Sequence, residues 1–180
     1  MIQLRVPATS ANLGPGFDAF GIALNLYNEF VIREKNEGAL PPGFSLLPRK
    51  NLGADAALLL ARKAKLTLPE LEFGIRAQVP RARGLGSSAT LTIAGIKAAD
   101  ALLQTHYSDA ELIALASQIE GHPDNAAPAL LGGFVISIRN GQNVQFFRSL
   151  PPKPLQVVVG VPDFELHTVK SRQALPEQVS

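Results

Sequence analysis

The 180-residue chain contains no cysteine and no tryptophan, and its charges nearly balance. Without cysteine it has neither a disulfide framework nor a thiolate metal site, a composition typical of proteins from a reducing compartment. Lysine and arginine number 17 against 15 for aspartate and glutamate, which gives a formal net charge of +2. Because no basic cluster accompanies this balance, the sequence argues against a nucleic-acid-binding protein.

Long apolar runs are missing as well. The longest ones, such as residues 56–61, are far shorter than the roughly 20 residues that cross a bilayer as a helix. An alternating strand pattern begins at residue 2, so we expect no targeting segment, no membrane contact and a cytoplasmic location. What the chain does have is 46% hydrophobic residues, enough for a sizeable core.

Two glycines and two serines lie within residues 84–88, between an expected strand and an expected helix. Residues 73–79 alternate between apolar and polar and end at Pro80, and apolar residues recur at helical spacing through 88–103. Glycines let a backbone approach a ligand, and the free N–H groups of a helix start attract anions such as phosphate. The loop lacks the lysine of the common P-loop and the third glycine of a dinucleotide fingerprint, and similar turns also occur without any ligand.

Two further polar segments stand out. Residues 6–18 follow an opening strand over 2–6 and display Asn12 and Asp18 among glycines, where these residue types are also ordinary turn formers. The other segment, residues 120–134, joins the end of an expected helix to a pair of glycines.

Glu120 lies in the last turn of an expected helix that begins with a capping box at Ser108 and Glu111. A carboxylate at that end faces the negative pole of the helix dipole, at a cost of roughly 0.3–1 kcal/mol. Glu120 is therefore either a solvated surface side chain or a group with a partner. His122, between a glycine and a proline, is open to two interpretations, a turn residue or a substrate contact.

The segments 80–90, 6–18 and 120–134 together resemble the GHMP kinases, and the last two resemble the homoserine kinase branch of that family. The resemblance implies an α/β fold, an α+β two-layer arrangement of the ribosomal protein S5 domain 2-like type. It also implies an ATP-dependent kinase that phosphorylates the hydroxyl of L-homoserine on the route to threonine, with Mg²⁺ as cofactor. The alternatives are another GHMP kinase, acting on mevalonate-type or sugar alcohols, and a catalytically incomplete nucleotide-binding module.

The resemblance assigns the nucleotide site to the glycine-rich loop and to Asn51, which is otherwise a helix cap. The implied ATP-binding residues are Asn51, Pro80, Arg81, Ala82, Arg83, Gly84, Leu85, Gly86, Ser87, Ser88, Ala89 and Thr90. Arg81 and Arg83 are also open to interpretation as solvent-facing side chains. The resemblance also implies Mg²⁺ on Ser88 and Glu120, and such sparse protein ligation suits this ion, which keeps waters and phosphate oxygens.

The implied homoserine contacts are Asn12, Asp18, His122, Thr168 and Arg172. Asp18 suits the substrate ammonium, and the planar guanidinium of Arg172 suits its carboxylate. No residue is a clear catalytic base, although Asn12 and Asp18 are candidates, and phosphoryl transfer can proceed by positioning and electrostatic stabilisation.

The remaining pattern predicts the elements on either side of these motifs. We expect a strand over 24–33, a loop over 36–50, helices over 53–65, 108–119 and 125–131, and a hairpin with its turn at Asn140-Gly141. A proline-rich linker at 150–154 divides a first domain, 1–150, from the start of a second, 155–180. By resemblance, a strand over 155–161 and a helix over 168–175 open a truncated ferredoxin-like domain. Their uncovered apolar faces predict self-association, for example as a homodimer.

Overall fold

The computed structural model describes residues 1–35, 37–161, 163 and 164. The elements in chain order are β1 (Ile2–Ala11), β2 (Phe20–Glu34), β3 (Ser45–Leu46), α1 (Leu52–Ala64), β4 (Leu71–Arg76), α2 (Ser87–Leu103), α3 (Asp109–Glu120), α4 (Ala126–Leu131), β5 (Phe134–Asn140) and β6 (Asn143–Ser149). No helix in this described part combines the length and the apolar character needed to cross a membrane.

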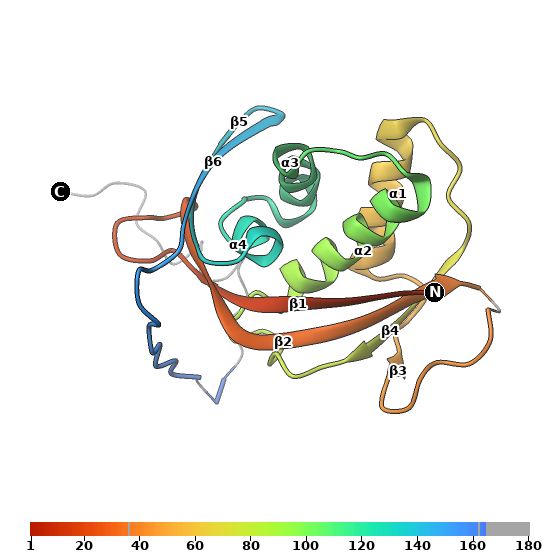
Figure 1. Cartoon of the computed structure of the whole chain (residues 1–180), viewed down its shortest axis with the longest axis horizontal. Coiled ribbons are helices and arrows are strands. Elements are labelled where there is room, and N and C mark those ends of the chain that lie inside the picture. Colours follow the sequence, from red (N-terminus) through yellow and green to blue (C-terminus); the bar gives the residue numbers. More distant parts are fainter. Residues whose placement is uncertain (36, 162, 165–180) are drawn as a thin grey trace.

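The strands form one antiparallel sheet in which β2 is the central strand. β1 lies along one side of β2. On the other side, β5 pairs with the beginning of β2 and β4 pairs with its end, because this strand of 15 residues is long enough to serve both. Figure 1 shows the helices gathered on one face of the sheet, which gives the fold two layers.

The core fills the space between the sheet and helices α1 and α2. Its largest buried side chains include Phe30 from β2, Phe73 from β4 and Leu60 from α1. Fully burying a side chain of this size contributes about 1.5–3 kcal/mol. The two helices approach closely at Gly95, because this residue has no side chain. A Cβ there would overlap the carbonyl oxygen of Gly53. The middle of α2 is therefore held against the start of α1.

The helix predictions that fall on described residues are confirmed. α1 begins at Asn51, whose Oδ1 accepts a hydrogen bond from the backbone N–H of Ala54 at 3.0 Å. α3 begins with the expected capping box of Ser108 and Glu111, and it ends at Gly121 with φ 91°. Each of these helices thus starts and stops where its own sequence specifies.

The strand predictions are wrong in their bounds. β1 runs to Ala11, so the expected loop after residue 6 is partly strand, and β2 is longer at both ends than 24–33. β4 stops before the expected end at residue 79 because the backbone N–H groups of Gln78 and Val79 both donate to Asn28 Oδ1, at 3.0 Å. A side chain thus replaces the last part of the expected strand ladder.

The β5–β6 hairpin is confirmed, although its two-residue turn lies one position later than expected, at residues 141–142, because Asn140 pairs with Asn143. The expected strand over 155–161 is wrong. Residues 150–161 are exposed and contain neither helix nor strand. A strand needs a neighbour that satisfies its backbone hydrogen bonds, and no described strand pairs with this segment. The helix expected over 168–175 lies outside the described residues.

Candidate functional site

The start of α2 differs from an ordinary helix start in leaving its first turn open. Gly86 precedes the helix with φ 64°, no side chain caps the first turn, and that turn contains no acidic residue. The backbone also has positive φ at Ala82 and Gly84. The first-turn N–H groups are free of side-chain caps and lie at the positive end of the helix dipole, so the start of α2 can accept an anion.

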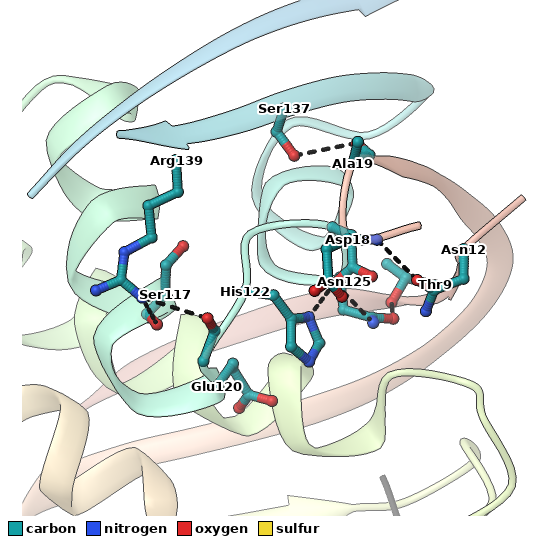
Figure 2. A network of polar contacts seen from close by, with 12 residues as sticks. Thr9, Asn12, Asp18, Ala19, Ser117, Glu120, His122, Asn125, Ser137 and Arg139 are labelled. Atoms are coloured by element: carbon teal, nitrogen blue, oxygen red, sulfur yellow. Dashed lines mark hydrogen bonds and ion pairs between the residues drawn. The ribbon is translucent and has the colours of Figure 1, made fainter. Parts of the chain in front are cut away.

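Close packing fixes this loop against the N-terminal strand. The N–H of Thr9 donates to the carbonyl oxygen of Leu85 at 3.2 Å, and Thr9 Oγ1 donates to Asn125 Oδ1 at 2.8 Å. A Cβ on Gly86 would overlap Thr9 Oγ1 and lie 3.0 Å from Asn125 Oδ1. The structure therefore joins the three sequence segments at one place, and Gly86 is needed for their contact. Figure 2 shows Thr9 beside Asn125.

The structure brings Ser88 and Glu120 together, as the sequence predicts. Ser88 Oγ donates to Glu120 Oε2 at 2.8 Å, and Thr92 Oγ1 donates to Glu120 Oε1 at 2.6 Å. The sequence analysis did not select Thr92. Its position four residues after Ser88, on the same face of α2, is the signal that points to it.

Glu120 is the last residue of α3, but the negative end of that helix has a cation beside it. Arg139 Nη1 donates to the carbonyl oxygens of Ser117 at 3.2 Å and Gly121 at 3.3 Å (Figure 2). The guanidinium offsets part of the unfavourable interaction that Glu120 has with the helix dipole. Glu120 is partly exposed, and both of its carboxylate oxygens accept side-chain hydrogen bonds, which favours the interpretation of Glu120 as a group with partners.

The chemistry of this group fits a magnesium ion. A carboxylate and two hydroxyls supply only oxygen donors, which a hard cation prefers. They lie beside a helix start that accepts anions, so an ion bound here would neighbour a phosphate held by α2.

Asn12 and Asp18 form a tight turn after β1. Both residues have positive φ, 58° and 56°, a conformation that Asn and Asp tolerate better than most side chains. Asn12 Oδ1 accepts from the backbone N–H of Asp18 at 2.8 Å, so the turn role expected of Asn12 is confirmed. The turn places the Asp18 carboxylate beside the segment that follows α3.

That segment contributes His122 and Asp124 to the same cluster. One ligand atom from each of Asp18, His122 and Asp124 lies within 4.8 Å of the others (Figure 2 shows Asp18 and His122). His122 Nδ1 contacts Asp124 Oδ1, and Asn125 Nδ2 donates to the same oxygen at 3.3 Å. Asp124 is completely buried, and its Oδ2 has no hydrogen-bond partner among the described residues. Two carboxylates in so small a space favour a cationic ligand group such as an ammonium.

Asp124 and Asn125 are not among the site residues predicted from the sequence. Both belong to a string of turn-forming residues after the α3 glycine, where no pattern separates a buried carboxylate from an exposed one. Burial arises because the backbone of β2 presses against this segment: a Cβ on Gly21 would overlap the carbonyl oxygen of Asp124. Only the fold reveals that contact.

The other predicted site residues are less closely grouped. Asn51 caps α1, and its Nδ2 donates to the carbonyl oxygen of Pro48 at 2.8 Å. Arg81 is exposed, as expected, whereas the half-buried Arg83 donates through Nη2 to the carbonyl oxygen of Asp163 at 3.2 Å. The substrate contacts expected at residues 168 and 172 lie outside the described part of the chain.

The chain is similar to known proteins in both sequence and structure. Residues 51–133 match the GHMP kinases N terminal domain. The chain is 41% identical to a homoserine kinase of Clostridium beijerinckii, over 100% of this chain and 61% of that protein. It is also similar in structure to the homoserine kinase of Cytophaga hutchinsonii, with a TM-score of 0.73 and 28% identity over 99% of this chain and 61% of the other. A candidate homoserine kinase of Listeria monocytogenes gives a TM-score of 0.70 and 35% identity over 96% and 63%.

These similarities confirm the expected GHMP kinase fold. In this chain the fold is an antiparallel sheet with helices on one face. The chain spans about three fifths of the length of the relatives it matches. With the matched domain including α1, the glycine-rich loop, α2 and the Glu120 segment, the chain belongs to the GHMP kinase family.

Proposed function

We propose that this chain carries the nucleotide- and substrate-binding residues of a homoserine kinase. The reaction transfers the γ-phosphoryl group of ATP to the hydroxyl of L-homoserine and gives O-phospho-L-homoserine, on the route to threonine. The observation that carries the proposal is the meeting of the three motif segments, through the Ser88–Glu120 bond at 2.8 Å and the Thr9–Asn125 bond at 2.8 Å. The similarity to homoserine kinases over the whole chain supports it.

In this proposal the triphosphate of ATP binds the loop of residues 80–90 and the open start of α2. The uncapped first turn supplies N–H donors, and the absence of an acidic residue there leaves the dipole free to attract phosphate. Arg81, exposed beside the loop, adds positive charge. Asn51, although it caps α1, keeps its proposed place at the nucleoside end.

Ser88 and Glu120 are the proposed magnesium ligands. When bound, the ion neutralises charge on the β- and γ-phosphates. Thr92 holds the second oxygen of the Glu120 carboxylate and so fixes its direction. Arg139 holds the end of α3 in place behind it.

For the acceptor, Asp18 is proposed to bind the ammonium group, and the buried Asp124 adds negative charge nearby. Asn12 keeps Asp18 in its turn, and His122 contacts the substrate. Thr168 and Arg172 are proposed to bind the substrate carboxylate. An amino acid needs both charges matched, whereas a sugar alcohol needs neither, and this favours homoserine over other acceptors of the family. The transfer needs no dedicated base because positioning and electrostatic stabilisation supply most of the effect.

The proposal also covers the surroundings of the enzyme. We infer a cytoplasmic protein with ATP and homoserine as its partners and no nucleic-acid or membrane partner. Division into a domain 1–150 and the beginning of a second at 155–180 remains part of the proposal. The exposed apolar side chains of Leu155, Val158 and Phe164 support self-association, as a homodimer for example.

The function is tested by an ATP-dependent phosphorylation assay against L-homoserine, mevalonate and simple sugar alcohols. The assay uses this chain and a longer form that matches its relatives in length. Homoserine should be the preferred acceptor. Asp18→Asn keeps a residue that tolerates φ 56° and removes only the charge, so it should weaken homoserine use about ten- to hundredfold and leave the Kd for ATP unchanged. Arg172→Lys should act in the same direction.

Preference of both forms for mevalonate or for a sugar alcohol would assign the chain to another GHMP kinase activity. ATP binding without turnover of any acceptor by either form would leave a nucleotide-binding module. An Asp18→Asn protein that uses homoserine as well as the parent would remove the amino-acid assignment from this turn.

The magnesium assignment is tested by Glu120→Gln. Because the amide lacks the charge, half-maximal activity should require roughly tenfold more Mg²⁺, and the free energy of unfolding should fall by about 1 kcal/mol through weaker bonds from Ser88 and Thr92. Glu111→Gln makes the same exchange at the opposite end of α3 and should leave the magnesium dependence unchanged. An equal dependence in both variants would reject Glu120 as a ligand.

A further inference from the structure

Asn28 is a buried amide that lies outside the proposed ligand contacts. It occupies the middle of β2, opposite Val6 of β1, and only 1% of its surface is exposed. An amide buried in a sheet next to apolar neighbours is unfavourable unless its donors and acceptor find partners. The partners of Asn28 are therefore informative.

All of these partners belong to the two ends of the glycine-rich loop. Asn28 Oδ1 accepts from the backbone N–H groups of Gln78 and Val79, both at 3.0 Å. Asn28 Nδ2 donates to Thr90 Oγ1 at 2.9 Å, and Thr90 Oγ1 in turn donates to the carbonyl oxygen of Ser87 at 2.8 Å. One side chain thus connects the entry of the loop, residues 78–79, with the first turn of α2.

The chemistry of these contacts requires an amide. Two backbone N–H donors need an oxygen, which settles the orientation of the Asn28 side chain. The Thr90 hydroxyl donates its hydrogen to the carbonyl oxygen of Ser87, so it can only accept in its bond with Asn28, which must supply the donor. An ionised aspartate supplies the oxygen but no donor, and a leucine of similar branched shape supplies neither.

We propose that Asn28 is the positioning residue of the phosphate-binding loop, an inference that rests on the proposed function. It touches no ligand in this assignment. It fixes the separation of residues 78–79 from the start of α2, and the intervening loop of 80–86 then has to adopt the positive-φ turns at Ala82, Gly84 and Gly86. The loop is thereby preorganised before the nucleotide binds, which improves affinity by removing the cost of ordering.

The test combines hydrogen exchange on the nucleotide-free chain with calorimetric titration of Mg-ATP, for Asn28→Asp and Asn28→Leu. Exchange at the amides of residues 78–90 should accelerate at least tenfold, and the Kd for Mg-ATP should rise by tenfold or more. Phe30→Leu is the matched control, because it loses packing two residues along the same strand and none of the loop bonds. It should lower the thermal midpoint while leaving both the loop exchange and the Kd near the parent values.

If Asn28→Leu fails to fold, Asn28→Asp decides the result, since it keeps the two bonds from the backbone N–H groups of Gln78 and Val79. Unchanged exchange at 78–90 in that variant overturns the inference. The inference is also overturned if the Kd for Mg-ATP rises in proportion to the loss of thermal midpoint in both Phe30→Leu and Asn28→Asp. Failure of the parent chain to bind Mg-ATP overturns the proposed function instead, and exchange then still decides whether Asn28 orders the loop.

Discussion

The starts of α2 and α3 solve the same physical problem in opposite ways. The first N–H groups of any helix lack intrahelical partners. In α3 the Ser108 side chain accepts from the Glu111 N–H, and Asp109 and Glu111 place negative charge in the first turn. In α2 a glycine with φ 64° precedes the helix, with neither a capping side chain nor an acid. α3 is closed by its own residues, and α2 is left open to an external anion.

This contrast separates the capped start of α3 from the start that we propose as the phosphate site. The start of α1 is closed in the same way as that of α3, with Asn51 as its cap and Asp55 in its first turn. An uncapped start forgoes about 0.5–2 kcal/mol of stability, and the protein accepts that loss at α2 alone among these three long helices. The difference is therefore a better guide to the ligand site than the glycines by themselves.

The largest effect is expected from closing the α2 start sterically. Gly86→Ala should lower the free energy of unfolding by about 2–4 kcal/mol, because a side chain at positive φ is strained and the new Cβ overlaps Thr9 Oγ1. Chemical denaturation measures the loss. Gly84→Ala is the control: its φ is also positive, 70°, but a Cβ there meets nothing within 4 Å, so it should lose only about 1–2 kcal/mol. Equal losses would show that the loop does not press on β1.

A smaller effect, on binding, is expected when α2 is given the charge pattern of α3. Ser87→Asp places a carboxylate in the first turn, which should raise helix stability by about 0.3–1 kcal/mol and weaken Mg-ATP binding at least tenfold by repelling the phosphates. Ser87→Asn has the same shape without the charge and should bind nearly as the parent does. Titration calorimetry compares the two. If the aspartate and asparagine variants bind with the same Kd, α2 does not hold the phosphates.

The smallest effect is expected from opening α3. Ser108→Ala removes the cap and should lower the free energy of unfolding by about 1 kcal/mol, with no change in nucleotide affinity. The hydrogen bonds from the Ser108 hydroxyl and backbone N–H hold the pKa of Glu111 below its ordinary value of 4.5. A lowered pKa stabilises the fold above that value, and the stabilisation is lost as the pH falls through the folded pKa.

The stability gap between the parent and Ser108→Ala should therefore narrow on acidification below pH 4.5. Unfolding curves at neutral and acidic pH give the gap directly. A gap that is constant with pH would mean that the Glu111 carboxylate takes no part in the cap. A change in nucleotide affinity would contradict the separation of the two helix starts.

Local signals predicted the helices well, because caps and stop glycines act within a few residues. Asn51, Ser108 and Gly121 lie where the sequence places them. Strand ends were predicted poorly, because a strand ends where its neighbour stops offering partners. β4 ends early because Asn28, about fifty residues away in sequence, accepts from the N–H groups of Gln78 and Val79. The strand expected at 155–161 has no described neighbour and does not form.

For the candidate site, the sequence by itself determined the glycine-rich start of α2 and the place of Glu120 in the last turn of α3, because both are local properties. The pairing of Ser88 with Glu120 followed from the resemblance to the GHMP kinases. Only the tertiary structure decided that Thr92 shares Glu120, that Asp124 is buried beside Asp18, and that Asn28 ties the loop to α2. These contacts depend on how β2 packs against segments distant in sequence. Burial and long-range hydrogen bonding are properties of the folded chain, and no local pattern encodes them.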